Sequence, residues 1–67
     1  MAKQVEIYKY KIVIRYIDNI DIFVEDSPIE PSTIDFRLNN QHFDFISVGN
    51  KSFNKKDIIY IEELKGV

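Results

Sequence analysis

The sequence predicts a mostly β protein of the α+β class, built as a strongly curved antiparallel sheet or small barrel of about five strands. One short helix or turn is expected near residues 28–39. Apolar and polar side chains alternate over residues 8–16 and again over 20–25, as in strands with one buried face. Short polar turns separate the apolar segments. At 67 residues, the chain is expected to be one domain, 1–67, with residues 1–4 disordered.

The first two strands are predicted to form a long β-hairpin over residues 8–26. In its first arm the even positions are all apolar or aromatic: Tyr8, Tyr10, Ile12, Ile14 and Tyr16. In the second arm the even positions are again apolar: Ile20, Ile22 and Val24. Because side chains in a strand alternate between two faces, both sets are expected on one buried face.

The turn of this hairpin sets its register. A two-residue loop at Asp18-Asn19 would mix apolar and charged side chains on each face. A three-residue turn, Ile17-Asp18-Asn19, keeps the apolar sets together, and asparagine tolerates the positive φ that this turn needs. The predicted pairs are then Tyr16 with Ile20, Ile14 with Ile22, and Ile12 with Val24.

On the opposite, outer face this register places charges across from one another. Arg15 would lie opposite Asp21 and Lys11 opposite Glu25, and such pairs contribute roughly 0.2–1 kcal/mol each. An apolar pair would stand between them, Val13 opposite Phe23. Either this pair is exposed, as the centre of a protein interface with a polar rim, or a helix or loop covers it. The candidate protein-binding residues are therefore Val13, Phe23, Lys11, Arg15, Asp21 and Glu25.

The middle of the chain contains the helix signals. Ser27-Pro28-Ile29-Glu30 predicts a single turn with Ser27 as its cap. A short helix over residues 32–39 is favoured next, although Ile34, Phe36 and Leu38 also alternate with polar residues as a strand would.

The last third of the chain predicts three short strands. His42 to Val48 is one, with a bulge or bend near Phe45-Ile46. Gly49-Asn50 is a two-residue turn that pairs Val48 with Lys51 and Ile46 with Phe53. Residues 54–57 are expected to form a one-turn polar corner. Residues 58–61 are expected to form a strand buried on both faces. Five strands joined by such turns resemble an SH3-like or Sm-like small barrel.

The tail also resembles another group of proteins. The segment from Phe53 to Glu62, FNKKDIIYIE, is similar to the ending of many small proteins of AT-rich Gram-positive bacteria and their phages. The bias of the chain toward Ile, Lys, Asn and Tyr agrees with this resemblance. The resemblance implies a phage or prophage origin but no particular activity, and it supplies no site residues.

The composition argues against catalysis. The chain has no cysteine, one histidine and two glycines, so thiol chemistry, disulfides and cysteine-bound metals are excluded. No phosphate-binding loop or nucleophile motif is present. His42 and Asp44 are read as solvated residues at a loop edge. We therefore expect no enzyme activity, cofactor or metal. The absence of a signal peptide and of a long apolar segment predicts a cytoplasmic protein with no membrane association.

A binding module is the remaining interpretation. The formal net charge is −2, with six acids and no cation between residues 18 and 35. The favoured partner is another protein or a second copy of the chain. The alternative is an Sm-like nucleic-acid-binding protein that uses Lys51, Lys55, Lys56 and Arg37, whose charges could follow a phosphate backbone.

Overall fold

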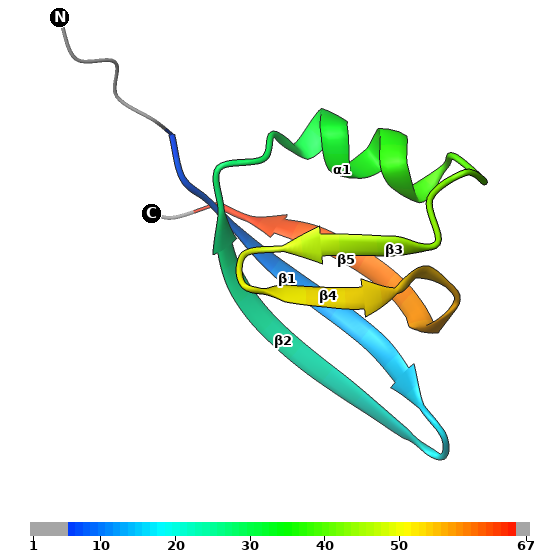
Figure 1. Ribbon diagram of the computed structural model, residues 1–67. Coiled ribbons are helices and arrows are strands. Elements are labelled where there is room, and N and C mark those ends of the chain that lie inside the picture. The colour runs from blue at the N-terminus through cyan, green and yellow to red at the C-terminus, as the bar shows by residue number, and fades with distance from the viewer. Residues whose placement is uncertain (1–5, 66–67) are drawn as a thin grey trace, which may run out of the picture.

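The computed structural model describes residues 6–65, so the prediction for residues 1–4 lies outside the described residues. The described chain forms five strands, one α-helix and one short 3-10 helix (Figure 1). In chain order they are β1 (Tyr8–Tyr16), β2 (Asn19–Ser27), α1 (Pro31–Leu38), β3 (Phe45–Val48), β4 (Lys51–Asn54), η1 (Lys55–Asp57) and β5 (Ile58–Leu64).

The strands form two antiparallel sheets. The larger has the order β2-β1-β5, and the smaller is the β3–β4 hairpin. In Figure 1 the hairpin lies across the larger sheet and α1 runs alongside it, so both cover one face. We call this the inner face and the opposite one the outer face. The prediction of a mostly β chain with one short helix is confirmed, but the described strands form two separate sheets rather than a closed barrel.

The hydrophobic core lies between the inner face and the elements that cover it. The alternation predicted for β1 is confirmed at Tyr10 and Ile12, which are fully buried, and at Ile14, which packs beside them. Tyr16 is an exception, because it ends the strand at the hairpin tip and is 58% exposed. The other elements contribute four buried side chains: Ile34, Ile46, Val48 and Phe53.

The register predicted for the β1–β2 hairpin is wrong by one residue. The chain reverses through two residues, Ile17 and Asp18, and Ile17 has a positive φ of 54°. Tyr16 therefore pairs with Asn19 rather than with Ile20. Since a shift of one residue exchanges the faces of a strand, Ile20, Ile22 and Val24 lie on the outer face and not in the core.

A contact with a distant segment supports this register. Phe23 now pairs with Ile12 on the inner face and packs against Phe53 of β4, with 5.4 Å between the ring centroids. On the outer face Val13 lies between Ile22 of β2 and Tyr60 of β5. Aromatic pairs of this kind contribute beyond the area that they bury. Phe53 lies outside the hairpin, so the alternation of the hairpin alone does not reveal this contact.

The helix is confirmed, with a different start. Pro31 is its first residue and Glu30 its N-cap, which suits a proline because the first helical N–H needs no partner. Residues 28 and 29 form a bend rather than the predicted helical turn, and Ser27 itself ends β2. Ser27 still acts as the predicted cap, because its hydroxyl accepts a hydrogen bond of 3.2 Å from the backbone N–H of Ile29. Ile34 is the helix residue that enters the core.

The β3–β4 hairpin has the predicted turn and the predicted pairs. Gly49 has a φ of 61°, and a Cβ at this position would lie 2.7 Å from the carbonyl oxygen of Asp26. A side chain here would therefore clash with the end of β2. β3 is shorter than predicted, because Phe43 belongs to the loop before it and only its ring reaches the core.

The polar corner is confirmed as η1, where the side chain of Asn54 accepts a hydrogen bond from the backbone of Lys56. β5 is not buried on both faces as predicted: Ile59 is 41% and Tyr60 44% exposed. The reason is that the helix and the small hairpin cover the inner face alone. Ile59 is also the extra residue where the register between β1 and β5 shifts.

The phenol of Tyr10 provides a test of this packing. Its hydroxyl donates to the backbone carbonyl of Ile29, in the segment that leads into α1. In Tyr10→Phe this half-buried carbonyl loses its donor, so we expect the free energy of unfolding to fall by about 1 kcal/mol. Urea denaturation followed by circular dichroism measures this, with Tyr16→Phe as the matched exposed control. Equal stability of the two variants would contradict the contact.

The same residue predicts a loss of stability in alkali. Burial, followed by the negative charges of Glu63, Asp35 and Glu30, raises the pKa of Tyr10 above its ordinary value of 10.0. A raised pKa in the folded state stabilises the fold below pH 10, and this stabilisation is lost as the pH rises through the folded pKa. The fall in stability above pH 10 is therefore expected to be smaller in Tyr10→Phe than in the native protein.

Candidate protein interface

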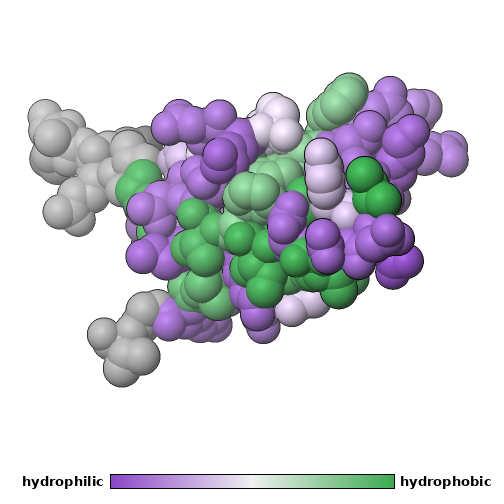
Figure 2. All heavy atoms as spheres, turned by 90° about the horizontal axis from the view of Figure 1, so that it is seen from below, coloured by the Kyte–Doolittle hydropathy of each residue, from purple (hydrophilic) through white to green (hydrophobic). Residues whose placement is uncertain are grey.

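Three large aliphatic side chains stand in a row on the outer face of β2. Ile20 is 62% exposed, Ile22 58% and Val24 51%. They occupy alternate positions of one strand, so they point to the same side of the sheet. Seen from below, the molecule shows hydrophobic atoms gathered across the middle of the surface and bordered by hydrophilic ones (Figure 2). Single exposed aliphatic residues are ordinary, whereas a contiguous exposed row is a candidate interaction surface.

The row continues across the sheet. Ile22 pairs with Val13 of β1, which pairs on its other side with Tyr60 of β5. Val13 is only 5% exposed because these two larger side chains flank it. We define the outer-face patch as Ile20, Ile22, Val24, Val13 and Tyr60.

Charged side chains border this patch. Along β1 the outer-face positions next to Val13 are Lys11 and Arg15. The Lys11 ammonium lies 5.9 Å from the centre of the Tyr60 ring, within range of a cation–π interaction. Lys11 also pairs in register with Glu62 of β5. An apolar centre with a charged rim is the usual anatomy of a protein interface.

The structure places the predicted protein-binding residues on two different faces. Val13, Lys11 and Arg15 lie on the outer face, as expected. Phe23 does not, because it packs against Phe53 on the inner face. The predicted charge pairs are also wrong, since Lys11 lies opposite Val24 and Arg15 opposite Ile20. Glu25 and Asp21 share the inner face with Phe23.

Sequence reasoning missed Ile20, Ile22, Val24 and Tyr60 as surface residues because it assigned them to the core. One signal could have found the three β2 residues. β2 carries apolar residues on both of its faces, with Phe23 out of phase with the others. Phe23 and the three aliphatic residues lie on opposite faces of β2, so the alternation alone does not say which face is buried. In the structure the face with Phe23 is buried.

The predicted nucleic-acid residues are divided, with Lys51 at one end of β4 and the other three near Phe43, whose ring lines one depression with Lys55 and Lys56. Lys51 follows the Gly49-Asn50 turn at one end of β4, and its ammonium lies 5.5 Å from the centre of the Phe23 ring. Lys55 and Lys56 follow the other end of β4. The Lys55 ammonium donates to the backbone carbonyl of Asn40, 2.6 Å away. The Arg37 guanidinium lies 5.8 Å from the centre of the Phe43 ring.

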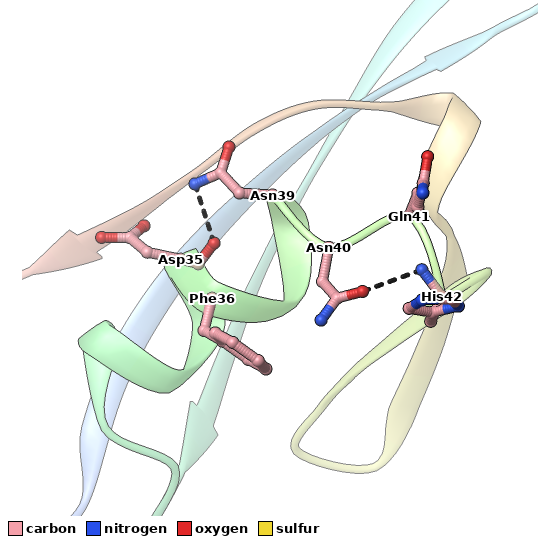
Figure 3. Close-up of a pocket in the computed structure, with 6 residues that line it drawn as sticks. All are labelled: Asp35, Phe36, Asn39, Asn40, Gln41 and His42. Carbon is pink, nitrogen blue, oxygen red and sulfur yellow. Dashed lines mark hydrogen bonds between the residues drawn. The ribbon is translucent and has the colours of Figure 1, made fainter.

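His42 lines a surface depression between the end of α1 and the following loop (Figure 3). Its backbone N–H donates to the side-chain oxygen of Asn40 at 2.9 Å, and the Asn39 amide donates to the carbonyl of Asp35. In Figure 3 the Asp35 carboxylate and the His42 ring lie at opposite ends of the depression. The two hydrogen bonds drawn there end the helix and shape the loop.

Tyr8, just before the patch in the chain, has a perturbed phenol. Its hydroxyl donates to the carboxylate of Glu6 at 2.6 Å. This hydrogen bond, followed by desolvation and the charge of Glu6, raises the pKa of Tyr8 to about 12. The Tyr8 hydroxyl therefore keeps its proton, and its role as a donor, further into the alkaline range than an ordinary tyrosine does.

Residues 6–65 contain no group of three or more potential ligand side chains that could hold a metal ion. Over the same range, no helix has the length and hydrophobicity required to cross a bilayer. Comparison with known protein families, with curated proteins and with solved structures finds no match.

Phe23 and Phe45 allow a comparison of a side chain that packs against the core with one that is exposed. Phe45 is 60% exposed, whereas Phe23 is half-buried against Phe53. We expect Phe23→Ala to lower the free energy of unfolding by about 2 kcal/mol or more, toward the range for buried phenylalanines. Phe45→Ala should change it by less than about 1 kcal/mol. Urea denaturation measures both, and a neutral Phe23→Ala would contradict the inner-face position of this ring.

Proposed function

We infer that this chain is a small, non-enzymatic protein-binding module that associates through the outer-face patch. The observation that carries the proposal is the row of Ile20, Ile22 and Val24, each more than half exposed on one sheet face. Burying these aliphatic side chains against a partner lowers the free energy by roughly 25 cal/mol for each Å² of apolar surface removed from water. The inner face is already covered by α1 and the β3–β4 hairpin, which leaves the outer face for a partner.

The rim supports the same function. Lys11 and Arg15 lie beside the apolar row, and Glu62 lies on the far side of Lys11. Charges at the edge of an interface contribute mainly to the rate and specificity of association. The proposal includes a cytoplasmic location, and the resemblance of the tail to small proteins of AT-rich Gram-positive bacteria and their phages supports an origin in such an organism.

A second candidate function is binding of single-stranded nucleic acid. The observation in its favour is that the exposed ring of Phe45 lines the same surface depression as Lys55 and Lys56. Proteins bind single strands by stacking the bases on exposed aromatic rings and by contacting the phosphates with nearby cationic side chains. Against it, Lys51 lies at the other end of β4 and Lys55 is already hydrogen-bonded within the chain.

One experiment separates the two functions. A photo-reactive benzoylphenylalanine is placed at Ile22 in one variant and at Phe45 in another, and both are irradiated in cells of the source organism. We expect the probe at position 22 to form adducts with protein, because it lies in the patch. The probe at position 45 should form none.

The outcomes are read from the adducts. Nuclease-sensitive adducts at position 45, with none at position 22, would favour nucleic-acid binding. Absence of any adduct at position 22, in a variant that circular dichroism shows to be folded, would contradict the proposed interface.

A further inference from the structure

The free edge of β2 lies beside the patch. β2 pairs with β1 on one side, and no strand within residues 6–65 pairs with its other side. Counting from the two-residue turn, the alternation of an antiparallel ladder directs the backbone groups of Asn19, Asp21 and Phe23 toward β1. Those of Ile20, Ile22 and Val24 are then directed to the open edge. The residues that expose apolar side chains therefore also offer unpaired backbone N–H and C=O groups.

We propose that two copies of this chain associate by pairing their β2 edges antiparallel about a two-fold axis at Ile22. The product is a continuous six-stranded sheet of order β5-β1-β2-β2-β1-β5. This inference rests on the proposed function and names a second copy as the partner of the patch. Pairing an open sheet edge with another strand is a common mode of protein association.

The apolar side chains select the centre of this pairing. With the axis at Ile22, the two Ile22 side chains lie opposite each other, and each Ile20 lies opposite Val24 of the other copy. All six aliphatic side chains then form one cross-strand set on the outer face. With the axis at Val24, Ile22 would instead lie opposite Asp26.

The acidic side chains exclude the two neighbouring centres. With the axis at Asp21, the two Asp21 carboxylates would lie opposite each other, and with the axis at Phe23 each Asp21 would lie opposite Glu25. Like charges directly across a ladder are destabilising. With the axis at Ile22, Asp21 lies opposite Phe23 of the other copy, and Glu25 lies opposite Asn19.

This arrangement also supplies a cation for Asp21. Within its own chain Asp21 pairs with Ile14, which pairs in turn with Ile58, so its neighbours along the sheet are apolar. The Lys51 ammonium lies 5.5 Å from the centre of the Phe23 ring. In the dimer, Asp21 of one copy would lie opposite Phe23 of the other copy. It would therefore also lie within reach of the other copy's Lys51, which sits over that ring. The two-fold axis makes this contact twice.

A dimer also suits the size of the chain. A domain of 67 residues buries only about 60% of its unfolded surface, and small domains often add stability by oligomerising. No disulfide can supply it, because the sequence has no cysteine.

The absence of native cysteine allows a direct test of the register. In Ile22→Cys the two new thiols would lie on opposed residues about 5.5 Å apart at Cα, which a disulfide spans. We expect rapid formation of a disulfide-linked dimer under mild oxidation. In Ile20→Cys or Val24→Cys alone, the like residues would be offset by four positions, about 13 Å along the strand. Each alone should stay unlinked, but a mixture of the two should give a mixed disulfide.

A charge exchange tests the contact between copies. Asp21→Lys and Lys51→Asp are each expected to weaken the dimer at least about fivefold, as sedimentation equilibrium measures, since two contacts are lost together. The double variant should regain most of the affinity. Circular dichroism controls for folding, and Lys56→Asp, at the other end of β4, is the matched control that should leave the affinity unchanged.

The outcomes separate this inference from the proposed function. A monomeric native protein whose position-22 probe captures a different protein would overturn the β2 dimer and leave the proposed function in place. A monomeric protein without any capture would overturn both. A dimer that links equally well through Ile20→Cys alone would also overturn the proposed pairing.

Discussion

The two-residue turn at Ile17-Asp18 is the constraint on which the rest of the structure depends. It sets the register between β1 and β2, and the register decides which β2 side chains meet the core. Phe23 is thereby turned inward against Phe53, while Ile20 and its neighbours are turned outward. A turn one residue longer would reverse both faces of the strand. The exposed patch and the core contact of Phe23 are therefore two consequences of one register.

Much of the fold could be predicted because its signals are local. The inner face of β1, the helix near Ile34, the turn at Gly49 and the corner at Asn54 all follow from alternation, capping or turn chemistry within a few residues. The β2 register could not be predicted in this way. It is supported by the contact between Phe23 and Phe53, which lies 30 residues later in the chain.

The same limit applies to the candidate site residues. Val13, Lys11 and Arg15 were placed correctly on the outer face because β1 has a single apolar set with a clear phase. Phe23 was misplaced because β2 has apolar residues on both faces, so its alternation does not decide which face is buried. The larger consequence is functional: the correct register replaces one candidate apolar pair with a continuous row. That row stands at an open sheet edge, where backbone pairing and side-chain burial can occur together.

The most direct test of this account is the pattern of nuclear Overhauser effects between β1 and β2. Residues in a pair without direct backbone hydrogen bonds bring their Cα atoms to about 4.5 Å, close enough for a strong signal between their Hα protons. The register described here predicts such signals between Val13 and Ile22 and between Lys11 and Val24. Strong Hα signals between Val13 and Phe23 and between Arg15 and Asp21 instead would show the three-residue turn, bury the aliphatic row and remove the basis of the interface.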